Sequence, residues 1–279
     1  MLSSIRRFFS FLARGPSLSL VTCLATVVLL ACSESANAQI FANLRADVRV
    51  TGIEPANNGG VTDGGNAGDE NGGNTQLIVG INSGLVQNWA LYGFDGIVPN
   101  GQAVTGATLT IVPNGAFTNG NHGSVEDSFN IHQVFTTNAG WNGGGQAISN
   151  NATNMANPGV VTFRQAGWTT QDWLDAGGNS VPNILGAFDA TPLASTGGYD
   201  QGAEPALLTF DFDAATAQGW VDDGFADLVL SVTDGVGDNT TRYGLGQLNA
   251  ALTIQTVPEP SSFVLALSCL VFFAVRRKL

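Results

Sequence analysis

The chain has 279 residues, a formal net charge of −12 and three cysteines. Residues 39–257, the body of the chain, hold all of its 22 acidic residues except Glu34 and Glu259, but no lysine. A surface this acidic repels nucleic acid and anionic lipid, which excludes nucleic-acid binding as the function. The cysteines all lie outside the body, so it can form no disulfide, cysteine zinc site or cysteine nucleophile.

Residues 1–38 have the three parts of a secretory signal peptide. Arginines precede the apolar run 18–32, and a small-x-small site follows at residues 36–38, which predicts cleavage before Gln39. The apolar run is shorter than the roughly 20 residues that a membrane-spanning helix needs. Two alternatives remain open at this point, an uncleaved anchor and lipidation of Cys32.

Short runs with alternating apolar side chains recur along the body and predict β-strands. The expected strands are 45–50, 76–81, 88–94, 106–112, 128–135, 160–164, 207–213, 226–232 and 251–256. One helix is expected at 214–221, with Asp213 as its N-cap. Because turn-rich segments separate the strands, we predict a single all-β domain, an antiparallel, jelly-roll-like β-sandwich over residues 39–256.

A glycine-rich loop at residues 63–74 is the best candidate for a metal site. Asp63, Asp69, Glu70 and Asn71 supply the oxygen ligands that Ca²⁺ prefers. The loop has no EF-hand spacing, and a plain solvated turn is the alternative. Asp234 and Asp238 form a weaker version of the same pattern. No other cofactor is expected.

Paired carboxylates would be needed for glycoside hydrolysis, and the sequence offers two candidate pairs. They are Asp211 with Asp213, and Glu126 with Asp127. Pairs this close arise by chance in so acidic a chain, and a capping role explains Asp213. His132 is expected to face solvent, and neither it nor His122 lies in a zinc-binding motif. We therefore expect no catalytic residues and a protein that is not an enzyme, with a secreted glycan-acting enzyme as the more distant alternative.

Tryptophans could stack on sugar rings, because a flat aromatic face packs on the apolar side of a pyranose. Trp141 and Trp168 lie near glycine-rich segments and are the candidates for an exposed carbohydrate-binding surface. Trp220 is expected in the core, at the end of the predicted helix. The alternative is that most of the tryptophans belong to the core of the sandwich.

The C-terminus carries three features in a fixed order: Pro258-Glu259-Pro260, the uncharged run 263–275, and Arg276-Arg277-Lys278. The apolar run can cross most of a bilayer as a transmembrane helix, with the basic residues on the cytoplasmic side and the body outside. This order closely resembles the PEP-CTERM sorting signal. The resemblance implies an exosortase-type membrane protease as a partner, and export by a bacterium that makes extracellular polysaccharide.

The body resembles a DNRLRE domain over most of residues 72–256. The segments that carry the resemblance are GGNTQLIVGI, NWALYGFD, VTGATLTI, FNIHQVFTTNAGWNGG and TFDFDAATAQGWVDDGFADLVLSV. An arginine that the family places before its leucine-rich strand is absent from NWALYGF, and TRYGLGQLNAALTI replaces the usual closing segment. The resemblance implies a jelly-roll-like β-sandwich of secreted and surface proteins, related to polysaccharide-binding modules.

Together these features predict an exported, non-catalytic protein of the cell surface or extracellular matrix, anchored in the membrane until it is processed. A carbohydrate-binding module that recognises exopolysaccharide is the alternative function.

Overall fold

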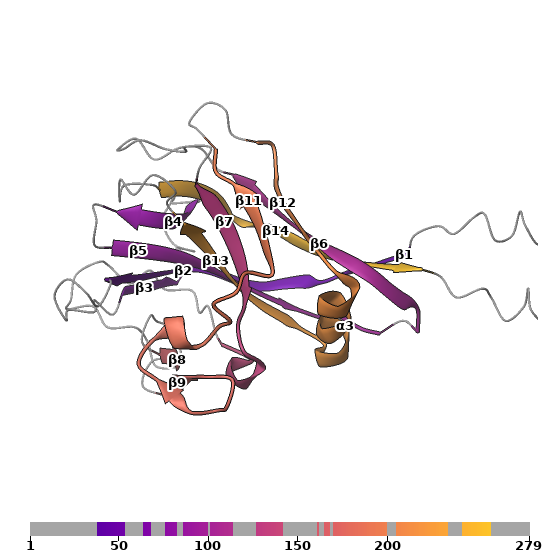
Figure 1. Ribbon diagram of the computed structural model, residues 1–279, viewed down its shortest axis with the longest axis horizontal. Helices are drawn as coiled ribbons and strands as arrows, with labels where there is room; N and C mark the ends of the chain where they lie inside the picture. The colour runs from indigo at the N-terminus through magenta and orange to yellow at the C-terminus, as the bar shows by residue number, and fades with distance from the viewer. Residues whose placement is uncertain are drawn as a thin grey trace, which may run out of the picture. The chain divides into compact units, whose positions relative to one another are not determined.

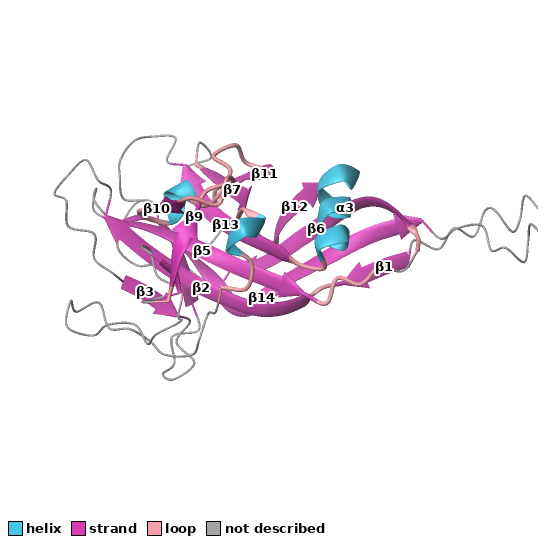
Figure 2. Cartoon of the chain, turned by 90° about the horizontal axis from the view of Figure 1, so that it is seen from below, coloured by secondary structure: helices cyan, strands magenta, loops and turns pink. Residues whose placement is uncertain are grey.

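The computed structural model describes residues 38–53, 64–67, 76–82, 86–99, 101–113, 127–141, 161, 165–167, 170–199, 205–233 and 242–257. Its elements are β1 (Ala38–Phe41), β2 (Asn43–Ile53), β3 (Gly64–Ala67), β4 (Gln76–Asn82), β5 (Val86–Asp95), β6 (Ala103–Pro113), β7 (Ser128–Gln133), η2 (Thr136–Asn138), β8 (Gln165–Gly167), β9 (Gln171–Leu174), β10 (Ser180–Val181), η3 (Ile184–Gly186), β11 (Ala194–Gly197), β12 (Leu208–Phe212), α3 (Ala214–Asp223), β13 (Ala226–Thr233) and β14 (Arg242–Val257). Strands dominate these ranges (Figure 2), so the fold is all-β and sandwich-like.

The main sheet has the strand order β11-β7-β13-β5-β4-β14-β6-β12 (Figure 1). β13 pairs antiparallel with β5 and β7, β12 with β6, and β4 with β5 and β14. β2 runs antiparallel to the other edge of β5, and β1 pairs with β14. β11 and β12 contact each other although they stand at opposite ends of the strand order. The sheet therefore coils, and strands from both ends of the order enclose one core.

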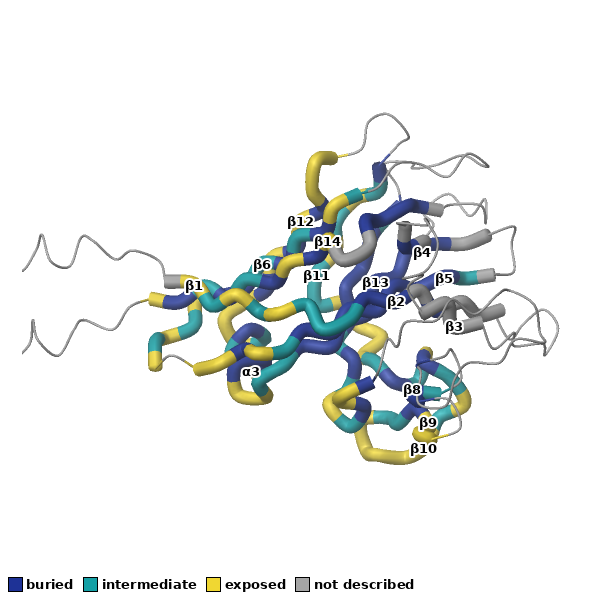
Figure 3. The backbone as a smooth tube through the Cα atoms, turned by 180° about the vertical axis from the view of Figure 1, so that it is seen from behind, coloured by how far each residue is buried: buried dark blue, intermediate teal, exposed yellow. Residues whose placement is uncertain are grey.

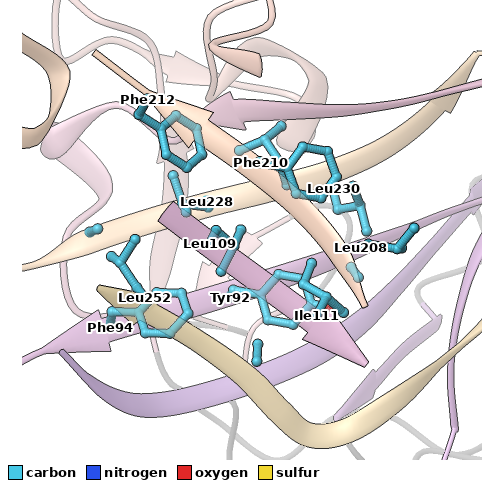
Figure 4. Packing of buried hydrophobic residues seen from close by; sticks show 14 of the residues in the cluster. Tyr92, Phe94, Leu109, Ile111, Leu208, Phe210, Phe212, Leu228, Leu230 and Leu252 are labelled. Atoms are coloured by element: carbon cyan, nitrogen blue, oxygen red, sulfur yellow. The ribbon is translucent and has the colours of Figure 1, made fainter. Parts of the chain in front are cut away.

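The main core is built from the inward-facing residues of seven strands, β4–β7 and β12–β14, together with the buried side of α3. In β12 the burial alternates strictly, so that Leu208, Phe210 and Phe212 point inward. Figure 4 shows these side chains in the interior with Leu109 and Ile111 of β6 and with Leu228 and Leu230 of β13. Burying such side chains stabilises the fold by about 1.5–3 kcal/mol each, which suits a body without disulfides.

A second layer, formed by residues 134–141, 161, 165–167 and 170–188, covers the face of β2, β5 and β13 that points away from the main core. Its small antiparallel sheet has the order β10-β9-β8. Val48, Trp89, Leu91 and Val229 of the main sheet pack there in one cluster with second-layer residues that include Trp173. Because it has a core on each side, β13 is buried along nearly its whole length, whereas β12 alternates (Figure 3).

Helix α3 begins and ends where the sequence provides caps. The Asp213 side chain accepts a hydrogen bond from the Thr216 backbone N–H at 2.8 Å, as a helix N-cap does. Gly224 ends the helix in the left-handed conformation, with φ of 78°, which glycine adopts without steric cost. Trp220 lies on the buried side, and its Nε1 donates to Gln133 Oε1 at 2.6 Å. The predicted helix, its cap and the core position of Trp220 are confirmed.

Most of the predicted strands are present, with shifted ends. β7 stops at Gln133, before the predicted end at residue 135, while β14 begins at Arg242, nine residues before its predicted start. Six short strands were not predicted, because two to four residues are too few to show an alternating apolar pattern; these are β1, β3, β8, β9, β10 and β11. The predicted strand 160–164 lies largely outside the described residues.

The chain divides into two compact units. One contains residues 39–100 and 104–255, and the other contains residues 1–38, 101–103 and 256–279. The second unit holds the predicted signal peptide and the predicted sorting signal, which lie outside the described residues except at Ala38 and Val257. No helix within the described ranges is long and apolar enough to cross a bilayer.

Candidate functional site

The described carboxylates of the two predicted pairs each accept a hydrogen bond from a different partner. Asp213 caps α3, and the hydrogen bonds from Thr216 lower its pKa. Asp211 is exposed on the outer face of β12, where its Oδ1 accepts from Thr108 Oγ1 at 2.7 Å. Asp127 is buried and its Oδ2 accepts from the Tyr243 hydroxyl at 2.7 Å. Glu126 lies outside the described residues.

Trp141 is not an exposed stacking surface. Its exposed fraction is 2%, and it belongs to the core between the main sheet and the second layer. The Arg45 guanidinium lies 5.3 Å from the centre of its ring, within the range of a cation–π contact. The prediction that Trp141 is exposed for sugar stacking is therefore wrong, because the second layer turns its indole inward. Trp168 lies outside the described residues.

The predicted calcium ligands Asp63, Asp69, Glu70 and Asn71 lie outside the described residues. The same holds for the sorting-signal residues Pro258, Glu259, Pro260, Arg276, Arg277 and Lys278, and for Cys32, His122, Asp234 and Asp238. Within the described ranges, no group of three or more His, Cys, Asp or Glu residues is placed to hold a metal ion.

A partly buried ion pair joins β2 to β13 beneath Trp141. Arg45 lies at a register shift between Leu44 and Ala46, and its Nη2 donates to Asp227 Oδ1 at 2.6 Å. The guanidinium crosses Gly93, where an added Cβ would lie 2.6 Å from Nη2, so only glycine leaves room for it. Burial raises the pKa of Asp227 to about 6, even though Arg45 lowers it.

His132 is buried, with an exposed fraction of 6%, and the prediction that it faces solvent is wrong. Phe188 of the second layer covers its ring at a centroid distance of 5.0 Å. Its Nδ1 lies 2.9 Å from the Asp189 carbonyl, which can only accept, so Nδ1 donates. Nε2 therefore accepts from the Ser231 hydroxyl, 3.0 Å away, and burial lowers the pKa of the imidazole.

This Ser231–His132–carbonyl series has the order of an activated nucleophile, its base and the group that orients the base. A nucleophile must also meet its substrate, and Ser231 is only 9% exposed in the middle of β13. Other polar side chains on the same face are hydrogen-bonded to one another: Asn130 Nδ2 donates to Thr233 Oγ1 at 2.8 Å, and Ser195 Oγ donates to Asn130 Oδ1 at 2.7 Å. These hydrogen bonds join β7 to β13 and to β11, which is a structural role.

The outer face of β12, β6 and β14 differs from this covered face, because its side chains are partly or fully exposed. A chain of hydrogen bonds crosses the three strands: Gln255 Nε2 donates to Thr108 Oγ1 at 2.9 Å, and Thr108 Oγ1 donates to Asp211 Oδ1 at 2.7 Å. Thr110 and Thr209 face each other in the next register position. We call these five side chains the polar face. It presents hydroxyl, amide and carboxylate groups whose positions are fixed by the strands.

The polar face was only partly visible in the sequence. The sequence pointed to Asp211 as an acid, but its partner Thr108 lies 103 residues before it, and Gln255, which donates to Thr108, lies 147 residues after Thr108. The alternation of β6 and β12 predicts which residues point outward, and only the strand order brings them together. No protein-family model matches the chain, and no curated protein sequence matches it.

Proposed function

We propose that this chain is an exported, non-catalytic protein of the cell surface or extracellular matrix. The proposal that it is non-catalytic is supported by the structural contacts of the side chains that could act in catalysis. Asp213 caps a helix, Asp127 binds Tyr243, Asp227 binds Arg45, and His132 binds Ser231. A side chain committed to a buried partner costs stability when it is withdrawn for chemistry.

The order of the terminal segments supports export. The signal peptide predicts entry into the secretory route, and Pro258-Glu259-Pro260 with its apolar run and basic cluster resembles a PEP-CTERM signal for an exosortase-type protease. A thiol-free, acidic body is suited to an oxidising, solvated exterior.

We further infer that the body is a jelly-roll-like, DNRLRE-type domain. The segments that carry the resemblance correspond to β4, β5, β6, β7, β12, α3 and β13, in that order. All of them contribute to the main core, so the resemblance follows residues that build the fold.

Mass spectrometry of the mature protein from its own cells tests the export route. We expect an N-terminus at Gln39 and a C-terminus within or near residues 257–260. Replacing Pro258, Glu259 and Pro260 by alanine should leave the protein in the membrane with its C-terminus intact. The matched control replaces Ser261 and Ser262 by alanine, outside the tripeptide. A full-length, uncut protein that is soluble inside the cell would contradict the proposal.

Polysaccharide binding is a second candidate, favoured by the polar face. Its groups can both donate and accept hydrogen bonds, as the hydroxyls of a neutral polysaccharide require. The excess of acidic residues in the body disfavours an anionic polymer.

Retention on the exopolysaccharide of the producing cells tests this candidate. Thr108→Val and Asp211→Asn should both weaken retention, whereas Asp222→Asn, at an exposed aspartate of α3, should leave it unchanged. Equal retention of all four proteins would remove the polar face as the binding site. Release of sugar fragments by the wild type but not by Asp211→Asn would support the glycan-acting enzyme instead.

A further inference from the structure

Strand β1 is ordered close to the predicted signal-peptide cleavage site. Cleavage before Gln39 would remove only Ala38 from this strand. The Ala42 backbone N–H donates to the Leu252 carbonyl of β14 at 3.1 Å, and Ile40 packs against the main core. Gln39 is exposed. The new N-terminus would therefore begin a paired strand, with the glutamine side chain free in solvent beside its own α-amine.

A glutamine at a free N-terminus can react with itself. The α-amino nitrogen attacks the side-chain amide carbon Cδ, forming an N–Cδ bond and closing a lactam. The Cδ–Nε2 bond breaks, and Nε2 leaves as ammonia with a hydrogen that the amine gives up. The reaction needs no oxidant, reductant or second substrate. We propose that Gln39 is converted to pyroglutamate in the mature protein, an inference that rests on the proposed export and cleavage.

The composition of the body gives this modification an unusual consequence. Residues 39–257 contain no lysine, and Lys278 lies beyond the sorting tripeptide. After both ends are processed, the α-amine of Gln39 is thus the sole primary amine that the sequence allows. The cysteines also lie outside the body. Cyclisation would leave a mature protein with neither an amine nor a thiol.

Such a surface would be inert to two kinds of covalent chemistry. Aldehyde groups, including those of reducing sugars, couple to proteins through amines as Schiff bases, and disulfide exchange needs a thiolate. A protein that resides among polysaccharides would escape both reactions. The lactam also removes the charge of an α-amine, whose ordinary pKa is about 7.7–8.0, and so makes the body more acidic.

For the test, the full-length gene is expressed in the producing cells, and the exported protein is labelled with an amine-reactive dye in the culture medium at harvest. Cyclisation during purification then cannot contribute to the result. We expect the wild type to take up almost no dye and its N-terminal tryptic peptide, Gln39–Arg45, to be lighter than the unmodified peptide by one ammonia. The matched control is Gln39→Ala, which keeps the small-residue cleavage site and a free amine. It should take up one dye per chain.

The outcomes separate this inference from the proposed function. An N-terminus at unmodified Gln39, with the wild type labelled as strongly as Gln39→Ala, would overturn the pyroglutamate while leaving export intact. An N-terminus at another residue would overturn the inference together with the predicted cleavage site. Dye on Lys278 would contradict the amine-free surface and would show that the sorting signal is still attached.

Discussion

The carboxylate of Asp227 has an exposed fraction of 1%, and Arg45 is its ionic partner at 2.6 Å. Burial nevertheless dominates and raises its pKa from 3.8 to about 6, because the ionised form loses more hydration than the guanidinium replaces. Between these two pH values the folded chain binds a proton that the unfolded chain does not. Where the folded state binds more protons than the unfolded state, lowering the pH stabilises the fold. This carboxyl therefore makes the fold more stable as the pH falls from about 6 to 3.8.

Asp227→Asn removes this titration and nearly preserves the size of the side chain. The unfolding free energy of the wild type should rise by roughly 2.4 kcal/mol relative to that of the variant as the pH falls from about 7 to about 4. Urea unfolding of both proteins at closely spaced pH values measures this difference. A difference that stays constant, or that shrinks on acidification, would mean that Arg45 holds the pKa of Asp227 at or below its ordinary value.

His132 should have the opposite effect on the pH dependence of the unfolding free energy. Burial lowers its pKa from 6.5, so the fold favours the neutral imidazole, and its contribution is present above pH 6.5 and lost as the pH falls below that value. His132→Gln keeps a side chain that can hydrogen-bond to Ser231 but cannot titrate. The wild type should therefore lose stability relative to this variant on acidification from pH 7. A thermal-melting series over the same pH range checks the sign, and a gain by the wild type would contradict it.

Trp141 provides a residue-scale test of the buried arrangement. Trp141→Ala should cost about 3–5 kcal/mol of unfolding free energy, because it leaves a cavity between the two layers and exposes Arg45 to a space that the indole filled. Trp141→Phe should cost less, since a ring remains. Denaturant unfolding measures both. Unchanged stability of Trp141→Ala would restore the exposed, sugar-stacking interpretation.

At the scale of elements, α3 depends on its N-cap. Asp213→Ala removes the acceptor of the Thr216 N–H and should lower the melting temperature by a few degrees, whereas Asp213→Asn, an equally good cap, should not. Asp211→Ala serves as a neighbouring control, because Asp211 contacts Thr108 and not the helix. Equal melting temperatures for Asp213→Ala and Asp213→Asn would show that the cap contributes nothing.

Strands whose apolar side chains alternate strictly could be predicted from the sequence. Which outer faces of the sheet a second layer covers could not. In β12 the alternation of Leu208, Phe210 and Phe212 correctly identified both the strand and its inward side. Alternation also placed His132 on the side of β7 opposite the main core, but it could not show that a second layer covers that side. Trp141 was misplaced for the same reason. The polar face and the Arg45–Asp227 pair needed the strand order, since their members are far apart in the sequence.

At the scale of the whole molecule, the last strand is central rather than peripheral. β14 lies between β4 and β6 in the main sheet and also pairs with β1. It contributes Tyr243, Leu245, Ala250, Leu252 and Ile254 to the main core. The sheet therefore cannot be completed until the end of the body has been synthesised, shortly before the predicted sorting signal.

Two truncations test this dependence. A chain that stops at residue 241 loses all of β14, and with it both the backbone partners of β4 and β6 and five core side chains, so we expect no cooperative unfolding transition. A chain that stops at Val257 keeps every described strand and should unfold cooperatively. Near-ultraviolet circular dichroism in a urea titration distinguishes the two, because it reports fixed aromatic packing. Cooperative unfolding of the shorter chain would mean that the remaining strands close a core without β14, and the central position of this strand would then not govern when the fold forms.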